Sequence, residues 1–436
     1  MHGLLKGNRL VGWPPLPLVV LAALAACAPA NPPVPTPTSG ALPANTDLRT
    51  KTPTPGPTPA PTSTPTPLEP KPSPISTPVL GVTITYIKMI DMSTGWAEGQ
   101  VGTEEASRIL RSTDGGGTWR DVSPPIREDL RGSFFLDAQL AWVWDRSGDP
   151  AWRTQDGGEN WTSVEGLGRS HDIWFSDSQN GWKLEATVWG LSFVQFDIES
   201  FATTQDGGQT WQEANPPPGR GSAYLAFPDA QTAWAVRAGF AETIERVPNL
   251  GVPFSVESTF DGGGTWTSRT MPLPDETSVV ERPYEGTYLS DVGNCAFISP
   301  VYSSTTIWKL ALTCEDQSWM YTTANQGKTW IISPMPAGLE ADIQFIDPTI
   351  GWLAIRDPLS HSQGQLYQTT NGGQSWSLLK RTGWSGVQLN FLDERVGWAV
   401  ACSGAWYCYQ DDARHALVKT TDGGQTWQIL QPQITP

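Results

Sequence analysis

The sequence predicts an all-β fold, a ring of seven blades with four antiparallel strands each, from three observations. A box ending in Trp occurs seven times, a second turn ending in Trp alternates with it, and the units so defined are about 50 residues long. The composition agrees, since 22 Trp, 43 Gly and 39 Pro favour short strands and tight turns over helices. Units of this size predict a seven-bladed β-propeller.

The chain begins with a predicted signal peptide, residues 1–26. Lys6 and Arg9 form a basic start, and LVVLAALAA (18–26) is an apolar core too short to span a bilayer as a helix. Leu-Ala-Ala-Cys, ending at Cys27, resembles the lipobox of bacterial lipoproteins. The resemblance implies cleavage before Cys27, a diacylglycerol on its sulfur, and export to the outer face of the cell membrane or the cell surface. The alternative is an ordinary cleaved signal with an incidental cysteine, and which membrane carries the anchor stays open.

Residues 27–80 are predicted to be a disordered tether. This segment has 17 Pro among Thr, Ser and Ala between residues 28 and 80, so it cannot bury enough apolar surface to fold. Fully extended, it would reach on the order of 160 Å.

Residues 81–436 form the predicted propeller, and the box is its clearest repeat. The pattern is Ser or Thr, x, Asp, x, Gly, x, Thr or Ser, Trp, with Asn at the third position of the fifth and sixth copies and Gln326 at the fourth position of the fifth. The third-position residues are Asp114, Asp156, Asp206, Asp261, Asn325, Asn371 and Asp422. The closing tryptophans are Trp119, Trp161, Trp211, Trp266, Trp330, Trp376 and Trp427.

The second repeat is a turn in which Trp follows an Asp by five positions. Six copies begin at Asp91, Asp137, Asp177, Asp229, Asp347 and Asp393, and SSTTIW (303–308) is a degenerate seventh. In the first unit, TITYIKMI (83–90) leads into the turn, WAEGQV (96–101) follows, SRILRS (107–112) precedes the box and WRDVS (119–123) leaves it. Each unit thus has four predicted strands. Whether residues 78–86 instead add a strand to the last blade is left open.

The residue types of the box indicate a structural turn. Asp accepts backbone N–H bonds, Gly adopts left-handed conformations, hydroxyls close the loop, and Trp packs inward. Seven near-copies around a ring do not suit a catalytic loop, and one Asp offers too few ligands for calcium. We therefore predict a structural role for every box.

The box resembles the Asp-box, or BNR repeat, of bacterial sialidases, sortilin-type receptors and other glycoside hydrolases. Together with the Gly-Trp that ends the Asp turn, it is most similar to the photosystem II assembly and stability factor family. The resemblance covers residues 83–431 and implies a seven-bladed propeller without catalysis, in which the box joins the third and fourth strands.

In a four-stranded meander both repeated turns fall on one face, which leaves the variable loops to the other. Long segments cluster there in the third to fifth blades (185–202, 237–254 and 272–291), and we expect them to bind a partner. Decorative loops are the alternative. The predicted partner-binding residues are Trp189, Arg237, Arg246, Arg282, Tyr284, Trp384 and Trp406. The other tryptophans outside the repeats, Trp144, Trp152, Trp174 and Trp319, are expected to be buried within strands.

The four cysteines after Cys27 are disulfide candidates, because the number is even in a chain predicted to be exported. Among the three possible pairings we favour Cys295 with Cys314 and Cys402 with Cys408, since each pair lies within one repeat. No metal site and no cofactor are predicted, because the sequence has no CxxC and its histidines are scattered.

The leading prediction of function is a non-enzymatic, membrane-tethered, monomeric propeller that binds or helps assemble an extracytoplasmic or membrane protein. A formal charge of −16 disfavours nucleic acid as a partner. The alternative is a glycoside hydrolase, sialidase-like or of another Asp-box type, or a carbohydrate-binding surface protein. The Arg-Ile-Pro motif of sialidases is missing from residues 81–110, and another glycosidase would need two carboxyl groups across the central cleft.

Overall fold

A computed structural model describes residues 81–435 except 103–105, 127–128, 147–149, 168–171, 190–194, 220–222, 238–254, 273, 275–294, 315–316, 337–338, 357–362 and 404–413. These residues belong to one compact unit. Every regular element among them is a β-strand, and none of them forms a helix that could cross a membrane. The predicted signal peptide, lipidated Cys27 and tether lie outside the described residues.

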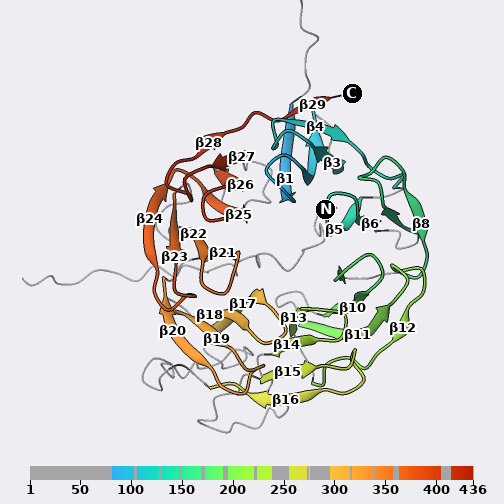
Figure 1. Ribbon diagram of the computed structural model, residues 1–436, viewed down its shortest axis with the longest axis vertical. Coiled ribbons are helices and arrows are strands. Elements are labelled where there is room, and N and C mark those ends of the chain that lie inside the picture. Colours follow the sequence, from blue (N-terminus) through green and yellow to red (C-terminus); the bar gives the residue numbers. More distant parts are fainter. Residues whose placement is uncertain are drawn as a thin grey trace, which may run out of the picture. The chain divides into compact units, whose positions relative to one another are not determined.

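Seven antiparallel sheets stand around a ring as the blades of a propeller, which confirms the predicted fold (Figure 1). The first four blades contain β1 (Val82–Met89), β2 (Gly95–Val101), β3 (Arg108–Ser112) and β4 (Thr118–Asp121); β5 (Leu130–Phe135), β6 (Ala141–Asp145), β7 (Ala151–Thr154) and β8 (Thr162–Val164); β9 (Asp172–Phe175), β10 (Gly181–Trp189), β11 (Gln195–Thr204) and β12 (Gln212–Glu213); and β13 (Ala223–Ala226), β14 (Ala233–Arg237), β15 (Ser255–Thr259) and β16 (Thr267–Thr270).

The remaining blades contain β17 (Cys295–Ser303), β18 (Trp308–Cys314), β19 (Gln317–Thr323) and β20 (Ile331–Met335); β21 (Leu339–Phe345), β22 (Gly351–Arg356), β23 (Gly364–Thr369) and β24 (Ser377–Thr382); and β25 (Ser385–Phe391), β26 (Gly397–Ser403), β27 (Arg414–Thr420) and β28 (Gln428–Ile429). In each blade the Asp turn joins the first two strands and the box joins the last two.

The Asp turn and the box of each blade are hydrogen-bonded to each other, so both lie on one face as predicted. The fourth residue of every box donates its N–H to a carbonyl in the Asp turn of its own blade, over 2.7–3.3 Å. In the first blade this bond runs from Gly115 to Ser93, and in the last from Gly423 to Arg395. We call this side of the ring the turn face.

The tryptophans of the Asp turns link neighbouring blades. All seven are fully buried, and in six blades the indole N–H bonds to the next blade. Trp96 donates to Asp137 O (2.8 Å), Trp352 to Gly423 O (2.9 Å), and Trp398 to Gly115 O (2.9 Å), which joins the last blade to the first. The box tryptophans are only half-buried, with the exception of Trp119. Burial of box tryptophans was therefore over-predicted.

A third periodic position supports these links and was missed in the sequence. This position lies two residues before the first residue of each turn and holds a large, mostly aromatic side chain. From the first blade to the seventh the residues are Met89, Phe135, Phe175, Phe227, Tyr302, Phe345 and Phe391. The turn Trp of the preceding blade stacks on several of these rings, as Trp142 does on Phe175 (3.7 Å between centroids) and Trp352 on Phe391 (3.8 Å). Each interface between such blades therefore combines an aromatic stack with a buried hydrogen bond.

The C-terminal strand β29 (Gln433–Thr435) closes the ring. It pairs in parallel with β4 and becomes a fifth, outermost strand of the first blade. At the inner edge, Gln388 Oε1 and Asn390 Oδ1 accept the N–H groups of Ile87 and Met89 on β1 (2.8 and 2.7 Å). Residues 82–89 thus belong to the first blade, and the two ends of the repeat array meet there.

Two local predictions needed correction. The segment 185–202, expected to be a loop, largely extends the β10–β11 hairpin, whose pairing reaches Trp189 opposite Gln195. In the fifth blade the turn residue is Ser304 rather than Ser303, because Ser304 Oγ accepts the N–H groups of Thr306 and Ile307 (3.4 and 3.0 Å). That turn is one residue shorter than the other six.

Candidate functional site

In all seven boxes the side-chain oxygen of the third residue accepts from the hydroxyl of the first residue and from the N–H of the seventh. In the last box, Asp422 Oδ1 accepts from Thr420 Oγ1 (2.8 Å) and Thr426 N (2.9 Å), and Asp422 Oδ2 accepts from Thr426 Oγ1 (2.6 Å). Thr420 Oγ1 in turn accepts the N–H of Gly424 (2.9 Å). These bonds satisfy the turn within itself. They lower the pKa of Asp422 to about 2, mainly through the Thr426 hydroxyl and N–H.

The substituted boxes keep this geometry without the charge. Asn325 Nδ2 donates to Thr329 Oγ1 (2.8 Å), and Asn371 Nδ2 donates to Ser375 Oγ (2.9 Å). Gln326 has a φ of 61°, where the other six boxes place a Gly with a φ of 75–81°. The box thus needs a left-handed residue at its fourth position and an oxygen at its third.

One position of the inner strands, three residues before the turn, differs in character from blade to blade. From the first blade to the seventh this position holds Lys88, Phe134, Trp174, Ala226, Val301, Gln344 and Asn390. In the sixth and seventh blades the side chain bonds to the backbone of the next inner strand, as Gln344 Oε1 does to Phe391 N (2.6 Å). In the second and third blades it is aromatic.

Asp342 lies two residues before Gln344 on β21. Its Oδ2 accepts the N–H of Leu389 on β25 (2.5 Å). Burial raises the pKa of Asp342 to about 6, against the effect of hydrogen bonds from the Leu389 and Ile343 N–H groups. This carboxyl group is therefore more easily protonated than an exposed one.

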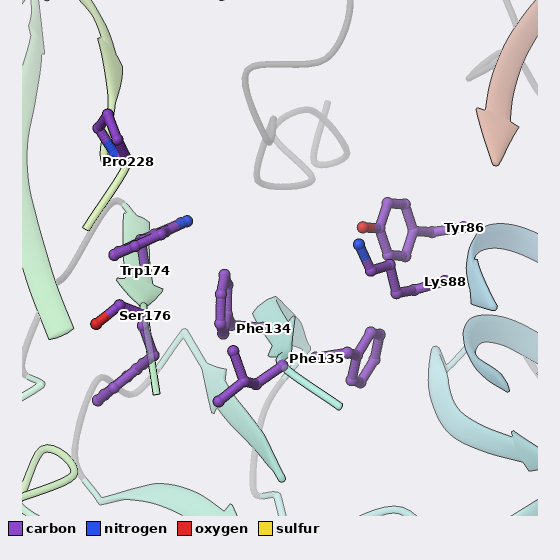
Figure 2. Close-up of a pocket in the computed structure, with 9 residues that line it drawn as sticks. Tyr86, Lys88, Phe134, Phe135, Trp174, Ser176 and Pro228 are labelled. Atoms are coloured by element: carbon purple, nitrogen blue, oxygen red, sulfur yellow. The ribbon is translucent and has the colours of Figure 1, made fainter. Parts of the chain in front are cut away.

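An aromatic pocket of about 360 Å³ opens where the inner strands of the first three blades reach the turn face. Figure 2 shows Tyr86 and Lys88 on one side, Trp174, Ser176 and Pro228 on the other, and Phe134 and Phe135 between them. Leu136 and Phe175 complete the lining. We call these nine residues the channel pocket.

The rings of the channel pocket are held in place by one another. Phe134 meets Trp174 edge-on (6.4 Å between centroids), and Tyr86 stacks on Phe135 (6.3 Å). Tyr86, Lys88, Phe134 and Trp174 are half-buried, so each presents part of its side chain to the cavity. The lining offers aromatic faces, one ammonium group and two hydroxyls, but no carboxyl group from the described residues. The accessible surface of the channel pocket therefore combines aromatic and polar groups.

The sequence did not identify the channel pocket. Trp152 and Trp174 were expected to be buried, as Trp144 and Trp319 are (2% and 9% exposed), but both are half-buried, and Trp174 lines the cavity. An alignment of the seven repeats could have revealed it, because the position three residues before the turn is aromatic in Phe134 and Trp174 but polar in Gln344 and Asn390.

Four of the seven predicted partner-binding residues lie outside the described residues. They are Arg246, Arg282, Tyr284 and Trp406. Only the backbones of Trp189 and Arg237 are described, at the ends of β10 and β14. Trp384 is half-buried, and its ring meets Trp427 edge-on (5.9 Å), against a core cluster of the last two blades.

The cysteines are placed in part. Cys402 is disulfide-bonded, and Cys408 lies outside the described residues, so their pairing stays a prediction. The backbones of Cys295 and Cys314 are partners in the β17–β18 register, which is compatible with the favoured pairing. Among the described residues no group of three or more His, Cys, Asp or Glu side chains could hold a metal ion.

No family model and no curated protein sequence matches this chain. Solved structures with a similar architecture include YCF48 bound to D1 peptide (18% identity over 70% of this chain and 81% of that one, TM-score 0.40). YCF48 from Cyanidioschyzon merolae has 14% identity over 81% and 98% of the two chains (TM-score 0.45). The GH74 enzyme of Niastella koreensis has 12% identity over 78% and 67% (TM-score 0.34).

Proposed function

We propose that this chain is a non-enzymatic binding scaffold, tethered outside the cell membrane through Cys27, that captures an apolar segment of a partner protein in the channel pocket. The observation that carries the proposal is the row of Tyr86, Phe134 and Trp174 on consecutive inner strands beside an open cavity. Rigid aromatic side chains bind at a small cost in conformational entropy, which makes them common anchors in protein interfaces. Each of these rings is carried by a strand rather than by a loop.

Site-specific crosslinking tests this proposal in the native membrane. A photoreactive amino acid in place of Ser176 lies in the channel pocket, whereas one in place of Ser163 lies on the outer strand β8. We expect the Ser176 probe to crosslink one partner segment, identified by mass spectrometry, and the Ser163 probe not to do so. Trp174→Ala and Phe134→Ala should each reduce that crosslink at least tenfold, about 1.4 kcal/mol. Equal crosslinking from both positions would contradict the proposal.

A glycoside hydrolase is the second candidate, favoured by the raised pKa of Asp342, because a glycosidase acid needs such a shift. Fluorogenic glycosides test it directly. Turnover that disappears in Asp342→Asn, while the unfolding midpoint is not lowered, would establish hydrolysis and displace the scaffold proposal.

A further inference from the structure

Exposed aliphatic side chains gather on one arc of the outer rim. Ile331, Leu378 and Ile429 are 55%, 46% and 67% exposed, and they are three of the five large apolar side chains exposed among the described residues. Each lies within two residues of a box Trp, on the outermost strand of its blade. These strands, β20, β24 and β28, follow one another along the edge of the ring (Figure 1). We call this arc, the fifth to seventh blades, the aliphatic rim.

The charge of the ring changes along the same arc. Lys328, Lys380 and Arg381 are exposed there, on the fifth box and on β24. The fifth and sixth boxes carry Asn325 and Asn371 in place of Asp, which removes two negative charges. The seventh box keeps Asp422, and its carboxylate accepts three hydrogen bonds from its own turn.

The opposite arc shows the contrast. The outer strands β4 and β12 expose Asp121 and Glu213, and the corresponding positions on β8 and β16 hold Ser163 and Ser268. The cations of these strands are Arg120, which pairs with Glu159, and the half-buried Arg269. In a chain with a net charge of −16, the aliphatic rim is therefore a local region of cations and aliphatic side chains. The Asn residues in the boxes and the exposed aliphatic side chains are independent differences from the other blades, and both make this arc less acidic or more apolar.

We propose that the aliphatic rim is a contact surface for an anionic lipid bilayer. The lysine and arginine side chains would meet lipid phosphates, and each cation near an anionic surface contributes a comparable increment of affinity. Ile331, Leu378 and Ile429 stand on three separate blades, and the polar residues Ser377 and Gln428 directly precede Leu378 and Ile429 on their strands. Single aliphatic side chains beside cations, rather than one continuous apolar patch, suit shallow insertion into an anionic bilayer interface.

Vesicle flotation of the full chain tests the surface, with Cys27→Ser in every sample so that the proposed lipid anchor cannot form. The vesicles contain phosphatidylcholine alone or phosphatidylcholine mixed with phosphatidylglycerol. We expect binding to the anionic vesicles only. The variant Lys328→Gln, Lys380→Gln, Arg381→Gln should bind on the order of 100-fold more weakly. The variant Ile331→Ser, Leu378→Ser, Ile429→Ser should lose about tenfold or more.

A matched control separates the rim from general hydrophobicity and from the N-terminal segment. Met92→Ser with Phe260→Ser removes the other two exposed apolar side chains, 58% and 42% exposed, and should leave binding unchanged. All variants share the same N-terminus and should unfold at the same urea concentration. Equal binding of the control and either rim variant would overturn the proposal, and so would equal binding to both vesicle types. A dimer of the unmodified chain that both rim variants dissociate would assign the surface to a second copy instead.

Discussion

Replacing Trp352 by Phe should destabilise the ring, because it removes an indole N–H that links two blades and part of a buried aromatic stack. The indole is fully buried, donates to Gly423 O in the next blade and stacks on Phe391 at 3.8 Å. The buried carbonyl left without its donor costs about 1–3 kcal/mol. The smaller ring of Phe buries less apolar surface and leaves a cavity, which costs about 2 kcal/mol more. The free energy of unfolding should therefore fall by about 3–5 kcal/mol.

Urea unfolding followed by far-ultraviolet circular dichroism measures this loss, with Trp384→Phe as the control. Trp384 is half-buried and meets the same core cluster, so its replacement should cost less than about 1 kcal/mol. A double-mutant cycle with Phe391→Leu should show a coupling of about 0.5–1.5 kcal/mol across the two blades. If Trp352→Phe costs no more than the control, the indole is not the link between these blades.

Three further outcomes follow from the hydrogen bonds. Asp422→Ala should cost about 1–2 kcal/mol in urea unfolding because Thr426 loses its acceptors, whereas Asp422→Asn, the natural solution at Asn371, should stay within about 0.5 kcal/mol. Deleting residues 433–436 should speed hydrogen exchange in β4, which loses its neighbour, with β24 unaffected. The raised pKa of Asp342 favours the folded state while the carboxyl group is protonated, and this contribution fades as the pH rises through about 6. Asp342→Asn should therefore raise the urea unfolding midpoint at pH ~8 but not at pH ~4. The reverse pattern would show that the folded state stabilises the carboxylate.

The repeated turns made the architecture predictable because their chemistry is local. An Asp side chain that caps N–H groups two and three residues on, or a Gly with a positive φ, acts within one segment and leaves a residue pattern. The bond from Trp96 to Asp137 joins residues 41 apart, in different blades. No pattern within one repeat reveals such a partner, so the indole bonds between blades were missed although every turn Trp was identified.

The channel pocket escaped prediction for the opposite reason. Its residues share a position at which the repeats differ, with Phe134 and Trp174 in two blades and Gln344 and Asn390 in two others. A comparison of repeats that looks only for recurring residues overlooks a position that varies between them. The predictions for the variable loops concern residues that mostly lie outside the described ranges, so they remain predictions.

Ring closure by β29 sets an order of events during synthesis of the chain. Thr435 Oγ1 bonds to Trp119 O across a separation of 316 residues. The first blade to be translated is thus the last to acquire its outermost strand. Until then the edge of β4 stays open to any extended peptide, including a neighbouring nascent copy. A polypeptide that stalls before β29 emerges would display a template for aggregation rather than a nearly finished ring.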